Sequence, residues 1–133
     1  MNRNIIIYAD DDLDDINMLQ DCMKDNGQVT LLPAYNGHDA LELIDRLNSE
    51  QVLPCLVILD INMPVLNGKD TLLKMKSDSN LKNIPVVLFS TTMTTEDKNF
   101  ATTNGVEFIS KPRSFKELEI TTNRFLEKCN FEL

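Results

Sequence analysis

Residues 55–64 read CLVILDINMP, and this stretch decides the fold. Five apolar residues in a row, without polar alternation, are typical of a strand that is covered on both faces, as in a parallel sheet. The run ends at Asp60, which places a carboxylate at the C-terminal tip of the strand. Open α/β sheets carry their reactive groups at that edge. Asp60 is therefore the first candidate for a functional residue.

Four more apolar runs repeat the pattern, at residues 4–9, 29–33, 85–89 and 106–109. Amphipathic stretches separate the runs, and their apolar residues recur at near-helical spacing, as Ile16, Leu19 and Met23 do. Strands that alternate with helices predict an α/β fold, a three-layer sandwich with a parallel sheet in the middle. The chain shows no linker, repeat or low-complexity segment, so we expect one domain over residues 1–133.

The composition excludes several classes of protein. The chain has 133 residues and a formal net charge of -8, so its surface would repel nucleic-acid backbones and anionic lipids. No apolar run approaches the roughly 18 residues that span a membrane, and the N-terminus does not resemble a secretory signal. Cys22, Cys55 and Cys129 are odd in number and widely spaced, which favours reduced thiols and a cytoplasmic protein.

Acidic residues follow the first apolar run as well. Asp10 and Asp11 come directly after residues 4–9, so two neighbouring strand ends would crowd their carboxylates against Asp60. Two negative charges at such a short distance repel each other, unless a cation lies between them or a raised pKa keeps one group protonated. Mg²⁺ prefers such oxygen ligands, and two strand-end carboxylates plus a backbone carbonyl would leave positions open for water and a phosphate oxygen. The pattern predicts a magnesium site.

A helix entry or an EF-hand calcium loop would also place acids after the first run. Carboxylates at a helix entry complement the helix dipole, and this accounts for three residues, Asp12, Asp14 and Asp15. It does not account for Asp60, which is followed by turn residues rather than by a helix. The EF-hand fails because Asp15 stands where the loop needs glycine, and because the preceding segment is strand-like.

Ser90 and Lys111 extend the candidate site. Ser90 closes the fourth apolar run and Lys111 lies just past the fifth, so both fall on the same edge of the sheet as Asp60. A hydroxyl, an ammonium group and a metal-binding carboxylate pair form a cradle for a tetrahedral phosphate. Three aspartates after the first strand exclude a glycine-rich nucleotide loop there.

Residues 91–103 differ from the other helical stretches, because six of the thirteen are threonine. Threonine is a poor helix former, so a helix here depends on tertiary contacts. Only Met93, Phe100 and Ala101 are expected to pack inward. One interpretation is an exposed helix with Thr95 as its N-cap; the other is a segment of low local stability, suited to moving.

These motifs together resemble the receiver domain of two-component response regulators, in the stand-alone, chemotaxis-regulator style. The matching stretches are residues 5–11, 56–64, 67–68, 85–91 and 108–112, so the resemblance covers essentially the whole chain. It implies a doubly wound (βα)5 flavodoxin-like fold with strand order 2-1-3-4-5 and no output domain. It implies a cytoplasmic signalling protein rather than an enzyme.

The resemblance also implies roles for individual residues. Asp60 would accept a phosphoryl group, and Lys111 would pair with it. Mg²⁺ would be held by Asp60, by Asp11 directly, by Asp10 mainly through water, and by the backbone carbonyl of Asn62. Ser90 would be the switch hydroxyl. Phe108 would be the switch aromatic, in place of a frequent tyrosine, and a cis peptide bond would precede Pro112.

Partners are implied only as classes. A sensor histidine kinase or a phosphotransfer protein would donate the phosphoryl group, and a downstream protein would bind the phosphorylated face of a monomer or a phosphorylation-linked homodimer. A phosphorelay carrier that passes the group to another histidine is an open alternative. A small Mg²⁺-dependent aspartyl phosphatase is less favoured, because Asn62 stands where those enzymes place a second aspartate. A vestigial scaffold is disfavoured by the complete residue set.

Overall fold

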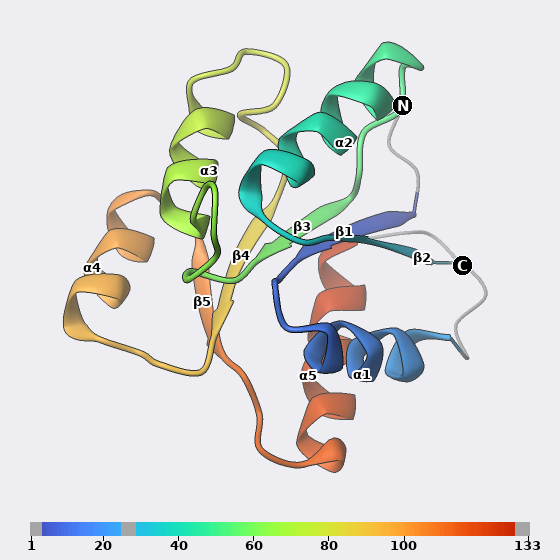
Figure 1. The fold of residues 1–133 in the computed structure, drawn as a ribbon, viewed down its shortest axis with the longest axis vertical. Coiled ribbons are helices and arrows are strands. Elements are labelled where there is room, and N and C mark those ends of the chain that lie inside the picture. The colour runs from blue at the N-terminus through green and yellow to red at the C-terminus, as the bar shows by residue number, and fades with distance from the viewer. Residues whose placement is uncertain (1–3, 25–28, 130–133) are drawn as a thin grey trace.

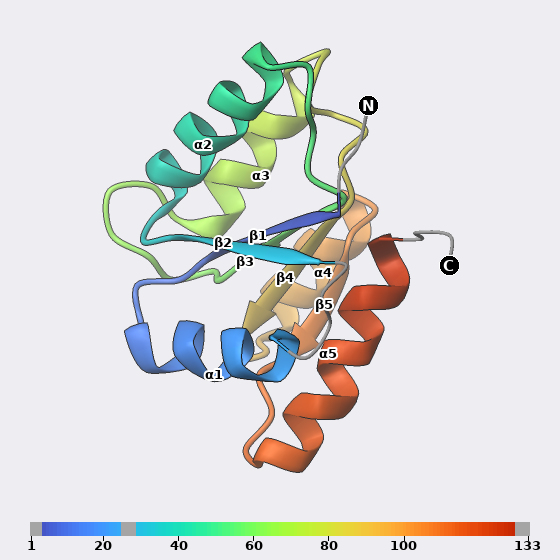
Figure 2. The same cartoon turned by 90° about the vertical axis from the view of Figure 1, so that its right-hand side faces the viewer.

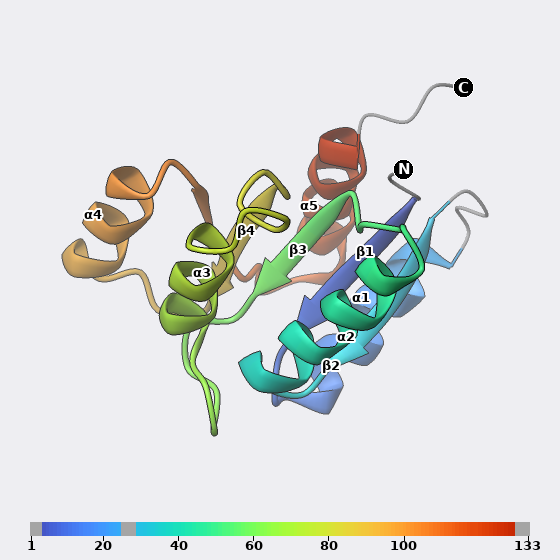
Figure 3. The same cartoon turned by 90° about the horizontal axis from the view of Figure 1, so that it is seen from above.

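The computed structural model describes residues 4–24 and 29–129. Its centre is a sheet of five parallel strands in the order β2-β1-β3-β4-β5 (Figure 1). The strands are β1 (Ile5–Ala9), β2 (Thr30–Ala34), β3 (Leu56–Leu59), β4 (Val86–Ser90) and β5 (Glu107–Ser110). The five predicted strands and their order are confirmed, with ends that shift by no more than one residue. Seen from above, the strands point the same way, so their carboxyl ends share one edge (Figure 3).

Helices cover both faces of the sheet, as predicted for a three-layer sandwich (Figures 1 and 2). One face carries α1 (Leu13–Met23) and α5 (Phe115–Cys129). The other carries α2 (Gly37–Ser49), α3 (Gly68–Lys76) and α4 (Thr95–Thr103). None of these helices, nor any other within the described residues, has the length and apolar character needed to cross a membrane.

The hydrophobic core lies in two layers because successive strand side chains point to opposite faces. Ile6 packs with Leu19 and Phe125 of the α1–α5 layer. Ile7, one residue later, packs with Leu72 on the other side of the sheet. The residues of β3 and β4 are all buried. Covering both faces explains why these two runs lack polar alternation.

Polar side chains fix where the helices begin. The side chains that accept a backbone N–H from the first turn are Asp12, Asn36, Asn67, Thr94 and Ser114. Such caps satisfy donors that have no partner within the helix. The N-cap of α4 is Thr94, so the prediction of Thr95 is wrong by one residue. The carboxyl ends of the strands are thereby joined to helices through short, well-anchored loops.

Helix α4 is attached to α3 by an ion pair that the sequence did not reveal. Asp97 is buried, and its carboxylate lies 2.6 Å from the ammonium of Lys69. The same ammonium lies 5.3 Å from the centre of the Phe100 ring. The hydrogen bond from Lys69 holds the pKa of Asp97 below its usual value. Ala101 is buried and Phe100 is half-buried against the core, as expected, whereas Met93 is 38% exposed and the buried Asp97 was not expected. Tertiary contacts thus support this threonine-rich helix.

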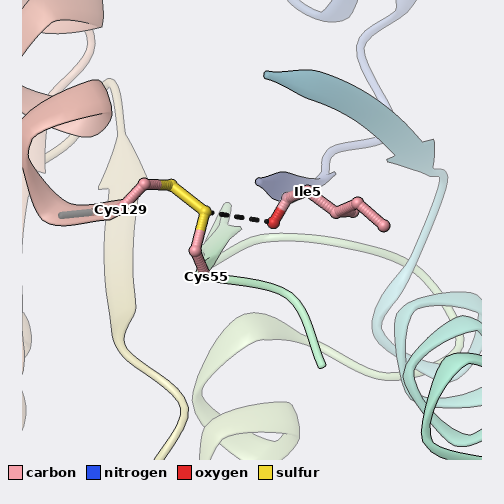
Figure 4. The surroundings of a disulfide bond; sticks show 3 residues. All are labelled: Ile5, Cys55 and Cys129. Atoms are coloured by element: carbon pink, nitrogen blue, oxygen red, sulfur yellow. Dashed lines mark hydrogen bonds between the residues drawn. A yellow bond between two sulfur atoms is a disulfide. The ribbon is translucent and has the colours of Figure 1, made fainter. Parts of the chain in front are cut away.

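A disulfide joins Cys55, at the start of β3, to Cys129, at the end of α5 (Figure 4). The two Cα atoms are 4.8 Å apart, a normal separation for a disulfide. The prediction of reduced thiols is therefore wrong for these two residues. Their separation of 74 positions in sequence hid the pairing, because only the fold brings the end of α5 beside β3. Cys22 is a free thiol.

Candidate functional site

The candidate site lies at the carboxyl edge of the sheet and is fixed by backbone hydrogen bonds. The backbone N–H of Asp60 donates to Ala9, at the end of β1, and that of Asp10 donates to Ala34, at the end of β2. The backbone N–H of Lys111 donates to Ser90 over 2.8 Å. Each of these residues directly follows a strand or closes one. The rigid sheet therefore sets their relative positions.

Three carboxylates meet at this edge. One oxygen from each of Asp10, Asp11 and Asp60 lies within 4.8 Å of the others. Asp10 is fully buried and Asp60 is 7% exposed, whereas Asp11 is exposed to solvent. The cluster is thus open on the Asp11 side and enclosed by protein on the other. Hard oxygen ligands at this spacing could hold a divalent cation.

Within the described residues, Lys111 is the only basic residue that forms an ion pair with these acids. Its ammonium lies 2.6 Å from Asp10 Oδ2, 2.8 Å from Asp15 Oδ2 and 3.6 Å from Asp60 Oδ2. Burial acts to lower the pKa of Lys111, but its hydrogen bonds to Asp10 and Asp15 outweigh this effect and raise the pKa. The lysine is therefore a fixed cation whose shortest contacts are not with Asp60.

The ionised form of Asp60 is electrostatically unfavourable in the folded protein. Burial raises its pKa to about 6, the charge of Lys111 opposes that rise, and the charge of Asp10 adds to it. Asp60 Oδ1 accepts the backbone N–H of Ile61 over 2.9 Å. The other oxygen, Oδ2, faces Lys111 at 3.6 Å, beyond hydrogen-bond distance. Oδ2 is thus the oxygen that remains available for a ligand or a reaction.

Asp10 differs, because its oxygens are largely occupied. Oδ2 accepts the hydroxyl of Tyr8 as well as the ammonium of Lys111. Oδ1 accepts the backbone N–H of Asp12 over 2.9 Å. A carboxylate offers about four acceptor positions, so Asp10 retains about one. Burial, and then the charge of Asp10, raise the pKa of Tyr8 and keep its hydroxyl a donor.

Tyr8→Phe should destabilise the chain, because it removes a donor from a fully buried carboxylate. Hydrogen bonds to charged groups contribute about 1.5–3 kcal/mol, so we expect the free energy of unfolding to fall by about that amount. Urea unfolding of the metal-free chain measures it. Tyr35→Phe is the matched control, because Tyr35 is 48% exposed and should change stability little. Equal stability of the two variants would contradict the assigned hydrogen bond.

The loop after Asp60 depends on a close backbone approach. A Cβ atom at Gly68 would lie 2.1 Å from the carbonyl oxygen of Asp60, a separation that no side chain tolerates. At this close approach the backbone N–H of Gly68 donates to the carbonyl oxygen of Ile61 over 2.9 Å. The loop therefore folds back on the strand end, with Asn62 exposed two residues beyond Asp60. The glycine explains why the motif ends in Asn67-Gly68.

Ser90 and Phe108 lie on the neighbouring strands. Ser90 ends β4 and is 2% exposed, and its strand partner is Ser110. Phe108 of β5 pairs with Leu88 and is half-buried. Phe108 also lines a hollow of about 550 Å³ beside α5, together with Lys111 and Ile120. The two residues thus connect the carboxylate edge with an open, partly apolar surface.

Two expectations about the site need correction. The sequence pattern assigns Asp15 only to a helix entry, but its carboxylate bonds Lys111 across 96 residues of sequence. The described peptide bonds are all trans, so the cis bond expected before Pro112 is wrong. Trans is the preferred isomer even before proline, by about 0.5–1 kcal/mol. Lys111 is aimed instead by its ion pairs and by its backbone bond to Ser90.

Comparison with known proteins places the chain in a family. The model of the response regulator receiver domain matches residues 6–123. The chain belongs to the response regulator receiver family. A crystal structure of the phosphorylated cyanobacterial phytochrome response regulator RcpA is 25% identical, with a TM-score of 0.85 over 94% of this chain and 92% of that one. The Mn²⁺-bound form of response regulator Rcp1 is 25% identical, with a TM-score of 0.80 over 93% and 95%.

Curated relatives show the receiver in different settings. The sensor histidine kinase CheAY of Helicobacter pylori is 28% identical over 92% of this chain, and the chain spans only 15% of its length. The polar-differentiation response regulator DivK of Brucella anthropi is 27% identical over 96% of this chain, which spans 93% of that protein. Receivers of this family thus occur as parts of larger proteins and as proteins of about this length.

Proposed function

We propose that this receiver accepts a phosphoryl group on Asp60 from a histidine kinase or phosphotransfer protein and then presents an altered protein-binding face. The observation that carries the proposal is the contrast between the carboxylates. Asp60 is buried and the nearest cation to its Oδ2, the ammonium of Lys111, lies 3.6 Å away, whereas both oxygens of Asp10 accept hydrogen bonds from Tyr8, Lys111 and Asp12. A nucleophile needs a free, ionised oxygen, and Asp60 is the enclosed acid that has one.

The donor set fits a divalent cation. The carboxylates of Asp10, Asp11 and Asp60 would hold it, with Asp10 acting mainly through water because its oxygens are already engaged. The carbonyl of Asn62 is the further proposed ligand. Magnesium would supply positive charge beside the phosphoryl oxygens when bound. The Mn²⁺-bound receiver of similar fold supports this assignment.

Transfer needs a positioned nucleophile and charge neutralisation. Asp60 Oδ2 would form a bond to phosphorus while the bond from phosphorus to the donor histidine nitrogen breaks, and that nitrogen keeps the electron pair. Lys111, 3.6 Å from Oδ2, would pair with the transferred oxygens. Ser90, buried at the same edge, would donate its hydroxyl to the phosphoryl group.

The output face would lie around β5 and α5. Movement of Ser90 would leave space for the Phe108 ring, which turns inward and changes the hollow that it lines. Met93 and Ile120, on the wall of that hollow, are 38% and 59% exposed. Exposed apolar side chains around a hollow are typical of protein-binding surfaces. We therefore expect a protein target for this face, and a signalling role in which the chain's chemistry is limited to its own phosphorylation and dephosphorylation.

Acetyl phosphate and Mg²⁺ test the proposal directly. Intact-mass measurement should show addition of one phosphoryl group, and borohydride trapping with peptide mapping should place it on Asp60. EDTA should prevent the reaction. Addition to another residue, or no addition under these conditions, would reject the proposed function.

A further inference from the structure

The ammonium of Lys111 has two strong carboxylate partners, and neither is the proposed phosphoacceptor. Its distances to Asp10 and Asp15 are 2.6 Å and 2.8 Å, whereas the distance to Asp60 is 3.6 Å. An ammonium group has three N–H donors, and two are taken by these short contacts. The lysine side chain is 9% exposed, so solvent does not compete freely for it.

Of these two partners, Asp15 is the one that can release the lysine. Asp10 is fully buried and is fixed by the Tyr8 hydroxyl and by a backbone N–H. Asp15 lies in the first turn of α1, its side chain is 31% exposed, and Lys111 is the ion-pair partner that the structure gives it. A partly solvated carboxylate exchanges a protein partner for water at low cost.

We propose that Asp15 is a positioning residue that restrains Lys111 away from Asp60 and so limits the rate of phosphoryl acceptance. The inference rests on the proposed function. Asp15 acts in two ways, since it occupies one donor of Lys111 and adds a negative charge beside an incoming anionic donor. Phosphoryl transfer depends on positive charge at the transferred oxygens. Loss of the Asp15 charge should therefore favour the reaction.

Asp15→Asn should accelerate labelling by acetyl phosphate at subsaturating concentration by about two- to fivefold, the size expected for one partly exposed ion pair. The gain should come mainly from a lower half-saturating concentration of acetyl phosphate. Asp15→Glu retains the charge and should return the rate toward that of the native chain. Asp14→Asn is the matched control, because it removes the same charge from the same turn, where the carboxylate is exposed and no described ion pair involves it.

A second measurement reports on the contact itself. The ¹⁵N resonance of the Lys111 ammonium, recorded without acetyl phosphate, should shift in Asp15→Asn and stay in place in Asp14→Asn. A rate for Asp15→Asn that equals the Asp14→Asn rate, or falls below that of the native chain, overturns the inference while leaving the proposed function intact. A native chain that acetyl phosphate and Mg²⁺ never label overturns both, whatever the lysine resonance does.

Discussion

Asp60→Asn should abolish labelling by acetyl phosphate and, without divalent metal, should make the folded chain more stable than the native one near pH 7.5. The loss of labelling follows from the proposed nucleophile, because an amide oxygen cannot form the acyl phosphate. The gain in stability follows from the free-energy cost of keeping Asp60 ionised in the folded state. Burial raises the pKa of Asp60 to about 6, whereas an unfolded chain leaves an aspartate near about 3.9. The ionised form is thus less favourable in the folded state.

The sign of the pH dependence follows from proton binding. Between about pH 4 and pH 6 the folded chain binds more protons at Asp60 than the unfolded chain, so stability falls as pH rises through this window. Above it, the full penalty is present and amounts to about 1–3 kcal/mol. Asparagine removes the penalty, so the advantage of Asp60→Asn should be near zero at about pH 4 and greatest above about pH 6.5.

Urea unfolding in EDTA at several pH values measures this advantage. Asp21→Asn is the control, because it removes one exposed carboxylate and reduces the net negative charge equally. Its effect should stay within about 0.5 kcal/mol and should not follow the same pH window. Mg²⁺ should stabilise the native chain more than it stabilises the Asp60→Asn variant, because the cation offsets the unfavourable negative charge that the variant lacks. If Asp60→Asn changed the free energy of unfolding by the same amount as Asp21→Asn at every pH, ionised Asp60 would not destabilise the folded chain.

The fold could be predicted because its signals are local. Each strand is a short apolar run, and the residues that follow it in sequence also follow it in space. Asp10, Asp60 and Lys111 could therefore be found from the sequence, since a parallel sheet gathers strand ends at one edge. Their actual distances could not, because the depth of each side chain depends on packing. The partners of Asp10, among them Tyr8, were missed for this reason.

Asp15 and Asp97 show why the rest could not be predicted. Both acids lie in the first turn of a helix, where the dipole alone is a sufficient explanation. Their ion pairs with Lys111 and Lys69 join elements that are distant in sequence. The orientation of α1 against β5, and of α4 against α3, decides whether those partners meet. Sequence spacing contains no record of it.

The disulfide has the same origin. Cys55 and Cys129 read as separate, reduced thiols because nothing in their spacing suggests a pair. Strand β3 is the central strand of the sheet. Helix α5 packs along one face of the sheet, and its last residue, Cys129, lies beside Cys55 at the start of β3 (Figures 2 and 4). This end lies opposite the carboxylate edge, since β3 begins after Cys55 and ends before Asp60. The bond therefore ties the terminal helix to the sheet far from the proposed site.

Reducing the disulfide should lower the free energy of unfolding by about 2–4 kcal/mol, because the cross-link restricts the unfolded chain over a long loop. The folded state should persist, since Phe125 and Leu118 remain packed in the core. Urea unfolding with and without a phosphine reductant measures the change. Cys129→Ser should reproduce it without reductant, whereas Cys22→Ser, at the free thiol, should keep the full response to the reductant. Identical unfolding curves for the native chain with and without reductant would contradict the assigned bond. The rate of acetyl phosphate labelling should not change after reduction, because the bond and Asp60 lie at opposite ends of β3.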